Sequence, residues 1–165
     1  MLEELNRRGT VVFMHPNAAD CCKGLVRDCP IRIVEFETDT ARTIASLLFS
    51  GAAERYRNIR FVFSHAGGTM PALIDRFTNA TKVSPGVAAN VPRGALAYLV
   101  SHYDTAQAAN ASALGALLQS VPCGAGRLWI GLPSMRRGRT GRIIARDVDS
   151  APEIWQTSSP ATRCD

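Results

Sequence analysis

Short runs of apolar, β-branched and aromatic residues predict the strands of this protein. The run over 10–14 is bounded by Gly9 and Pro16 and lacks polar alternation, which is typical of a strand buried on both faces. The run over 59–63 has the same character, and a shorter segment over 101–103 predicts a third strand. We therefore expect at least three buried strands.

The interval between the first two strands predicts one long helix. Residues 38–40 offer capping oxygens, and the apolar residues beyond them recur at helical spacing as far as Tyr56. We expect this helix to end near 57–58. The pattern thus changes from strand to helix and back to strand within the first third of the chain.

Three more helices are expected after the second strand. One carries apolar residues over 73–77, and residues 95–99 have a helical pattern. The Pro, Gly and Ala residues of 80–93 predict a loop, and Asn110 is placed to cap a helix that runs through Leu118. This β-α-β-α-β-α order predicts an α/β fold with parallel strands joined by helical crossovers.

Composition places the chain among ordinary globular proteins of one domain. It has 165 residues, of which 46% are hydrophobic and 20% charged. No apolar run approaches the ~18–20 residues of a membrane span, and residues 1–8 carry two acids and no apolar segment. We therefore expect no membrane partner and a cytoplasmic location. The odd number of cysteines, five, without zinc-ribbon spacing indicates free thiols.

The net charge of +5 is distributed unevenly along the chain. Residues 1–122 hold 12 basic and 10 acidic groups, whereas residues 123–165 hold 7 and 4, and all seven are Arg. The Arg/Gly run over 136–142 is the feature that would otherwise suggest RNA or phosphate binding. We expect no nucleic-acid partner, because this tail has the composition of an unrelated sequence.

Side chains able to bind metals or exchange protons stand at the carboxyl ends of the predicted strands. His15 follows the first strand, His65 follows the second, and Asp104 closes the third. In parallel α/β folds the chemistry gathers at these strand ends. The alternative for each histidine is a purely structural hydrogen-bonded role, and Asp104 can instead cap a turn or helix.

Three motifs together resemble the amidohydrolase-related family of metal-dependent (β/α)8 enzymes. They are Val-Phe-Met-His-Pro over 12–16, Phe-Val-Phe-Ser-His-Ala-Gly-Gly over 61–68 and Tyr-Asp-Thr-Ala over 103–106. That family includes aminocarboxymuconate-semialdehyde, resorcylate and methylsalicylate decarboxylases. The resemblance implies that 1–122 form part of such a barrel, about strands five to seven with their helices.

The same resemblance implies roles for the two histidines. His15 corresponds to a ligand of a divalent metal, usually Zn²⁺, and His65 to the acid/base that contacts the metal-bound water or substrate. The implied reaction is the non-oxidative decarboxylation of an aromatic or muconate-like carboxylic acid, a small molecule. The alternatives are a metal-dependent hydrolase of the same superfamily and a non-catalytic interaction remnant. The residues that would bind the substrate stay unknown.

Other parts of the family's metal site have no counterpart in this sequence. They are a His-x-His pair on strand one and an Asp in a Gly-Thr/Ser-Asp-Tyr/Phe-Pro motif on strand eight. We therefore expect the chain to be a fragment that is inactive alone and that self-associates through exposed barrel edges.

The tail over 123–165 is predicted to be a frameshifted or non-native translation. Trp129 is encoded by TGG and the Ile130 codon begins with AT, so reading one base later gives a glycine codon. The neighbouring codons permit Ala-Gly-Gln-Val-Val-Phe-Gly-Ser-Asp-Tyr-Pro, which contains the missing strand-eight motif. Sequencing the coding DNA tests this hypothesis, and a shifted frame without the Asp codon would contradict it.

Overall fold

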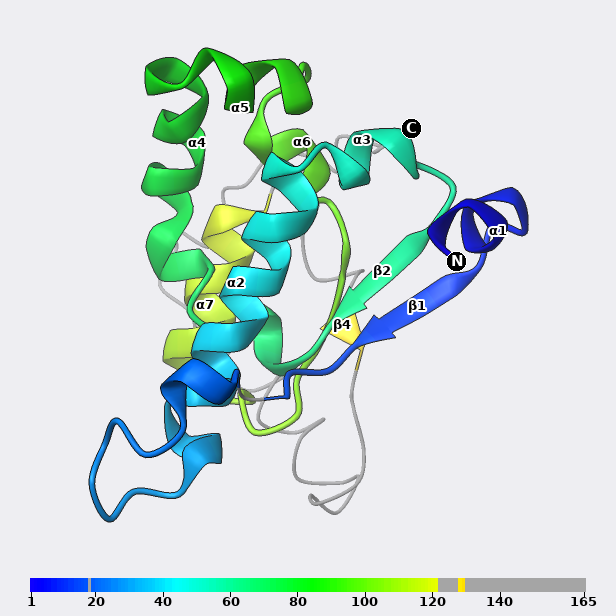
Figure 1. Cartoon of the computed structure of the whole chain (residues 1–165). Helices are drawn as coiled ribbons and strands as arrows, with labels where there is room; N and C mark the ends of the chain where they lie inside the picture. The colour runs from blue at the N-terminus through cyan, green and yellow to red at the C-terminus, as the bar shows by residue number, and fades with distance from the viewer. Residues whose placement is uncertain (18, 122–127, 130–165) are drawn as a thin grey trace.

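A parallel sheet forms the centre of the protein in a computed structural model that describes residues 1–17, 19–121 and 128–129. Within these residues the strand order is β1-β2-β3-β4, and every neighbouring pair is parallel. The strands are β1 (Val11–Met14), β2 (Arg60–Phe63), β3 (His102–Asp104) and β4 (Leu128–Trp129). The α/β class and the three expected strands are confirmed (Figure 1).

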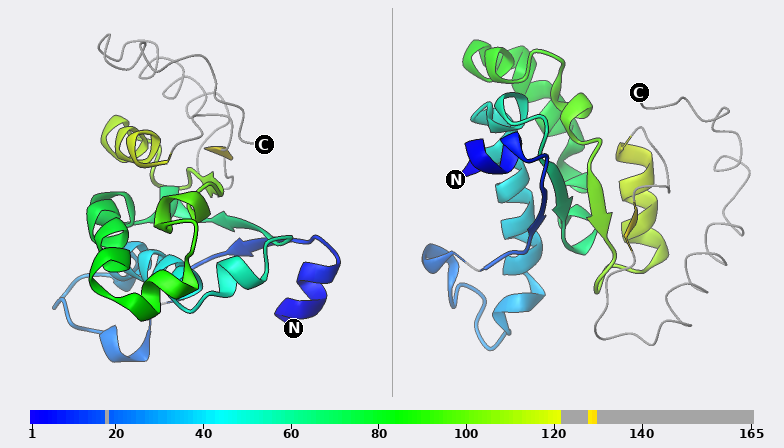
Figure 2. Two further views of the ribbon diagram at one scale, coloured as in Figure 1. Left: turned by 90° about the horizontal axis from the view of Figure 1, so that it is seen from above. Right: turned by 90° about the vertical axis from the view of Figure 1, so that its right-hand side faces the viewer.

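Helices and short 3-10 turns fill the intervals between the strands. The α-helices are α1 (Leu2–Arg7), α2 (Glu35–Phe49), α3 (Ala52–Arg55), α4 (Ile74–Val83), α5 (Pro85–Asn90), α6 (Ala95–Tyr98) and α7 (Ala111–Ser120). The 3-10 turns are η1 (Asp20–Cys22), η2 (Ile31–Ile33), η3 (His65–Gly67) and η4 (Pro71–Leu73). Both α2 and α7 contact η3, the turn after β2, and Figure 2 shows these two helices from two further sides.

The long helix expected between the first two strands is present but begins earlier than the sequence predicts. Thr38 Oγ1 donates to the carbonyl of Val34 at 2.8 Å, which is a bond made within the helix. The capping prediction for 38–40 is therefore wrong, because these residues lie inside α2. At its other end, Gly51 adopts φ +75° and separates α2 from α3.

Two further helix predictions had opposite outcomes. The loop expected over 80–93 is wrong, because α4 continues to Val83 and α5 begins at Pro85. Proline suits the first position of a helix, where its fixed φ is already helical and no N–H is needed. The cap at Asn110 is confirmed, because its Oδ1 accepts a hydrogen bond from the Ala113 N–H at 2.9 Å.

Strand β1 is not buried on both faces as the sequence predicts. Val11 is 43% exposed and Phe13 is 54% exposed, whereas Val12 and Met14 are partly buried against the core. The reason is that the core cluster packs against only one face of β1, so exposure alternates along the strand. In contrast, three of the four residues of β2 are buried, as predicted.

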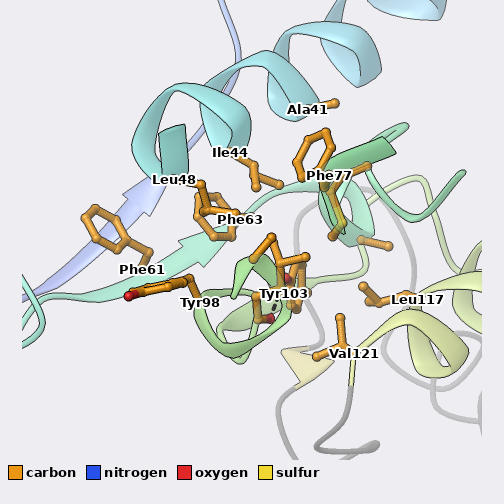
Figure 3. Close-up of a cluster of buried hydrophobic side chains, with 14 of the residues drawn as sticks. Ala41, Ile44, Leu48, Phe61, Phe63, Phe77, Tyr98, Tyr103, Leu117 and Val121 are labelled. Carbon is orange, nitrogen blue, oxygen red and sulfur yellow. Dashed lines mark hydrogen bonds between the residues drawn. The ribbon is translucent and has the colours of Figure 1, made fainter. Parts of the chain in front are cut away.

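A cluster of buried apolar and aromatic side chains fills the space between the sheet and its helices (Figure 3). Phe63 of β2 lies between two rings, with centroid distances of 6.1 Å to Phe61 and 5.9 Å to Tyr103. The Tyr103 hydroxyl donates to the Leu99 carbonyl at 2.8 Å, and burial raises the pKa of this phenol. Tyr103 thereby connects the core to the carboxyl end of β3.

No helix among the described residues is long and apolar enough to span a bilayer. The prediction of a frameshifted tail over 123–165 falls outside the described residues, except at β4. There, Tyr103 pairs with Leu128 and Asp104 pairs with Trp129, so these two residues extend the sheet beyond β3.

Candidate active site at the strand ends

The register of the sheet brings the candidate residues together at the carboxyl ends of the strands. Met14 pairs with Phe63, and Phe63 pairs with Tyr103, so these three residues form one row across β1, β2 and β3. His15 and Asp104 each follow their member of this row directly. Since the strands are parallel, their carboxyl ends lie side by side at the same end of the sheet.

The two histidines predicted from the sequence are in ring contact. The centroids of His15 and His65 are 5.4 Å apart, with the ring planes at 72° in an edge-to-face arrangement. Ser64, which is fully buried, supports this contact by donating to the Met14 carbonyl from its backbone N–H at 3.2 Å and from Oγ at 3.0 Å. These bonds fix the residue before His65 to the residue before His15.

His15 is held in the orientation of a potential metal ligand. Its Nδ1 lies 2.9 Å from the Pro16 carbonyl oxygen. A carbonyl can only accept, so in the neutral form of this ring Nδ1 carries the proton and Nε2 carries the lone pair. Metal-binding histidines usually donate a hydrogen bond from the N–H of their second ring nitrogen to such an acceptor. Phe13 and Phe36 flank the ring, at centroid distances of 6.3 and 5.9 Å.

His65 is buried on a turn with an uncommon backbone conformation. Both His65 and Ala66 adopt φ +54°, in the left-handed region. Oδ1 of Asp104 accepts the backbone N–H of His65 at 2.9 Å and that of Ala106 at 2.8 Å. The bond to Ala106 matches the turn-capping alternative for Asp104, and the bond to His65 gives it a second function at the strand ends.

The surroundings of the His65 ring favour its neutral form. Burial lowers the pKa of His65, with a smaller opposing effect from the Asp104 carboxylate and a further lowering from His15. Its Nδ1 is buried and makes no hydrogen bond within the described residues. Oε1 of Glu37 lies 3.8 Å from this Nδ1 atom, beyond hydrogen-bond distance.

Glu37 is a site residue that the sequence analysis missed. It lies in the first turn of α2 and is partly buried, and burial raises its pKa, as does the nearby Asp104 carboxylate to a smaller extent. No strand-end motif contains it, because a crossover helix brings it to the site. A correct start for α2 would have placed Glu37 near the strand ends, but its contact with His65 requires the folded chain.

The described residues supply only part of a metal site. No group of three or more His, Cys, Asp or Glu side chains in 1–17, 19–121 and 128–129 is arranged to hold a metal ion. The cysteines in these ranges, Cys21, Cys22 and Cys29, are free thiols. His15 fits the role of one ligand because the Pro16 carbonyl engages its Nδ1 and leaves Nε2 as the ring nitrogen that can bind a metal. Catalytic zinc sites usually have three protein ligands, so further ligands are required.

Comparison with known proteins identifies relatives among decarboxylases. The family described as "Amidohydrolase" matches residues 1–120. The 6-methylsalicylic acid decarboxylase acuB of Aspergillus aculeatus is 36% identical over 118 residues, covering 69% of this chain and 36% of the relative. Decarboxylase yanB of Aspergillus niger is 42% identical over 79 residues, covering 45% and 22%. The chain thus spans about a third of the length of the first of these relatives.

Solved structures confirm that the fold is part of a (β/α)8 barrel, as predicted. One is 5-carboxyvanillate decarboxylase LigW from Sphingomonas paucimobilis, with a TM-score of 0.70, 17% identity and coverage of 94% of this chain and 48% of that chain. Another is a dihydroxybenzoic acid decarboxylase from Polaromonas sp. JS666 with bound manganese, with a TM-score of 0.70, 16% identity and coverage of 93% and 48%. The chain corresponds to about half of each solved chain.

Proposed function

Because the chain belongs to the amidohydrolase family, we propose that it supplies two histidines to the site of a metal-dependent, non-oxidative decarboxylase of aromatic carboxylic acids. The observation that carries this proposal is the contact between His15 and His65 at the strand ends, 5.4 Å between ring centroids. The relatives 36% and 42% identical to the chain both carry the name decarboxylase, which favours this chemistry over metal-dependent hydrolysis.

His15 would hold a divalent metal through Nε2, with the Pro16 carbonyl fixing its ring. We expect Zn²⁺, and Mn²⁺ is the alternative that one solved relative suggests. When bound, the metal would orient and polarise the carboxylated substrate. The ring of Phe36 and the exposed ring of Phe13 add apolar surface beside His15, which suits an aromatic substrate.

His65 would exchange the proton that decarboxylation requires. Loss of CO2 leaves an electron pair on the ring carbon that carried the carboxylate, and a proton must replace the carboxyl group at that carbon. An imidazole that is neutral at rest and can be protonated reversibly meets this requirement. Asp104 holds the backbone of His65 in place through its 2.9 Å hydrogen bond.

A segment exchange tests this proposal. Residues 1–120 of this chain would replace the matching segment of the Aspergillus aculeatus decarboxylase, and metal content and CO2 release from 6-methylsalicylic acid would be measured. We expect the isolated chain to be inactive and the folded chimera to bind metal and release CO2. His15→Ala should remove most of the metal, whereas His65→Asn should retain metal and lose turnover.

Two results would contradict the proposal. One is a folded chimera that takes up no metal and releases no CO2. The other is a His15→Ala chimera with unchanged metal content and rate, which would show that the strand-end histidine is not a ligand. A Thr81→Ala chimera serves as the control, because the Thr81 hydroxyl donates to the Thr78 carbonyl within α4, away from the strand ends.

A further inference from the structure

The first turn of α2 contacts both histidines of the candidate site. Phe36 lies edge-on to His15, with ring centroids 5.9 Å apart and planes at 80°. The next residue, Glu37, places Oε1 3.8 Å from Nδ1 of His65. Two successive residues of one helix therefore face the two histidines, although neither belongs to a strand-end motif.

The Nδ1 atom of His65 is buried and makes no hydrogen bond within the described part of the chain. A buried polar group left unpaired costs about 1–3 kcal/mol. The carboxylate of Glu37 faces this atom, and a side-chain rotation that shortens the separation by about 1 Å would bring it to ordinary hydrogen-bond distance.

The backbone of Glu37 is already fixed against the turn that carries His65. Its carbonyl accepts a hydrogen bond from the Thr69 N–H at 3.2 Å. A Cβ on Gly68 would lie only 2.2 Å from that carbonyl oxygen, and Gly68 has φ +61°. Only glycine allows the helix and the turn to approach so closely. The fold therefore fixes the backbone position from which the Glu37 side chain reaches His65.

We infer that Glu37 is the positioning residue of His65, and that its carboxylate accepts a hydrogen bond from Nδ1–H and leaves the lone pair on Nε2. A carboxylate in this position fixes the orientation and tautomer of an imidazole and stabilises the imidazolium when Nε2 takes up a proton. The inference rests on the proposed function only for the part that Nε2 plays in the reaction.

Asp104, the other carboxylate near His65, makes its hydrogen bonds to the backbone of the strand-end turns. Its Oδ1 is occupied by the N–H groups of His65 and Ala106, at 2.9 and 2.8 Å. The two carboxylates thus have different targets. Asp104 holds the backbone of His65, and Glu37 faces its ring.

The tautomer of His65 tests the inference directly in the full, metal-free chain. Long-range ¹H–¹⁵N spectra of the imidazole rings distinguish Nδ1–H from Nε2–H, and a His65→Gln variant assigns the signals. We expect Nδ1–H to be the major form in the wild type and the minor form in Glu37→Ala. Glu37→Gln keeps an acceptor oxygen without the charge, so it should restore part of the Nδ1–H population.

Asp39→Ala is the matched control, because Asp39 lies two residues further along α2 and points to a different side of the helix. It should leave the tautomer unchanged. An Nε2–H tautomer in the wild type overturns the inference, as does an unchanged tautomer in a folded Glu37→Ala variant. If Glu37→Ala does not fold, the wild-type and Glu37→Gln spectra decide. A folded chimera that releases no CO2, together with the expected tautomer change in the chain, overturns the proposed function and leaves the positioning role intact.

Discussion

The backbone N–H of His65 donates a hydrogen bond of 2.9 Å to Oδ1 of Asp104, which lies 39 positions later in the chain. Because the same oxygen also accepts the Ala106 N–H, one carboxylate oxygen joins the turns that follow β2 and β3. His65 has φ +54°, a conformation that the surrounding structure must maintain. Asp104 therefore acts on the backbone of His65 and, among the described residues, makes no hydrogen bond to its ring.

Replacing Asp104 by alanine is expected to destabilise the fold markedly. The change leaves the buried N–H of His65 and the partly buried N–H of Ala106 without their acceptor. At about 1–3 kcal/mol for each unpaired group, the free energy of unfolding should fall by about 2–6 kcal/mol. Urea denaturation measures the difference. Asp104→Asn keeps an acceptor oxygen and should lose clearly less, so equal losses in the two variants would contradict this role.

Gly68 should tolerate no side chain, because the fold brings α2 against its backbone. A Cβ there would lie 2.2 Å from the Glu37 carbonyl oxygen. We expect Gly68→Ala to cost more than about 4 kcal/mol of unfolding free energy, the range typical of a severe steric conflict. Urea or thermal denaturation of the purified variant provides the measurement.

Gly24 is the matched control for this substitution. It also has a positive φ, +76°, but a Cβ at Gly24 would meet nothing within 4 Å. Gly24→Ala should therefore cost only the conformational penalty of about 1–2 kcal/mol. Similar losses at Gly24 and Gly68 would show that backbone conformation alone, and not the approach of α2, explains the requirement for glycine.

The strand ends were predictable from the sequence because short-range patterns define them. The apolar run before His15 and the run before His65 each become a strand, and parallel pairing then brings the two histidines together. Glu37 was not predictable in this way. Its relation to His65 depends on where α2 starts and how closely the helix approaches Gly68, and both are set by tertiary contacts.

The exposure of β1 could not be predicted for a different reason. An apolar run indicates burial, but burial depends on what packs against each face of the strand. Val12 and Met14 pack against the core, whereas Val11 and Phe13 on the other face are exposed. The apolar run therefore matches the burial that β1 would have in a complete barrel, of which the described residues form a part.

Asp104 and His15 should shift the pKa of His65 in opposite directions. In the metal-free chain its pKa is expected below the ordinary value of about 6.5, because burial disfavours the imidazolium. Asp104→Asn should lower this pKa further, since the carboxylate attracts the imidazolium, and His15→Ala should raise it. An NMR titration of the ring protons measures all three pKa values.

The sign of the stability change follows from this shift. As the pH falls through about 6.5, the unfolded state takes up a proton on His65 before the folded state does, so the free energy of unfolding decreases. The contribution of His65 is complete above this pH and is lost between it and the lower folded pKa. A folded pKa at or above 6.5 would contradict this expectation, as would a rise of the pKa in Asp104→Asn.

Strand β1 is expected to mediate self-association of the chain. It is the edge strand of the described sheet and carries two exposed apolar side chains, Val11 and Phe13, on one face. Edge strands with unpaired backbone groups and apolar side chains pair readily with other chains, and an inserted lysine opposes such pairing. Phe13→Lys should therefore shift the mass distribution in sedimentation velocity toward the monomer at a given protein concentration.

Val83→Lys is the control, because Val83 is 80% exposed at the end of α4, away from the sheet edge. An equal effect of the two lysines would indicate general solubilisation instead of association through β1.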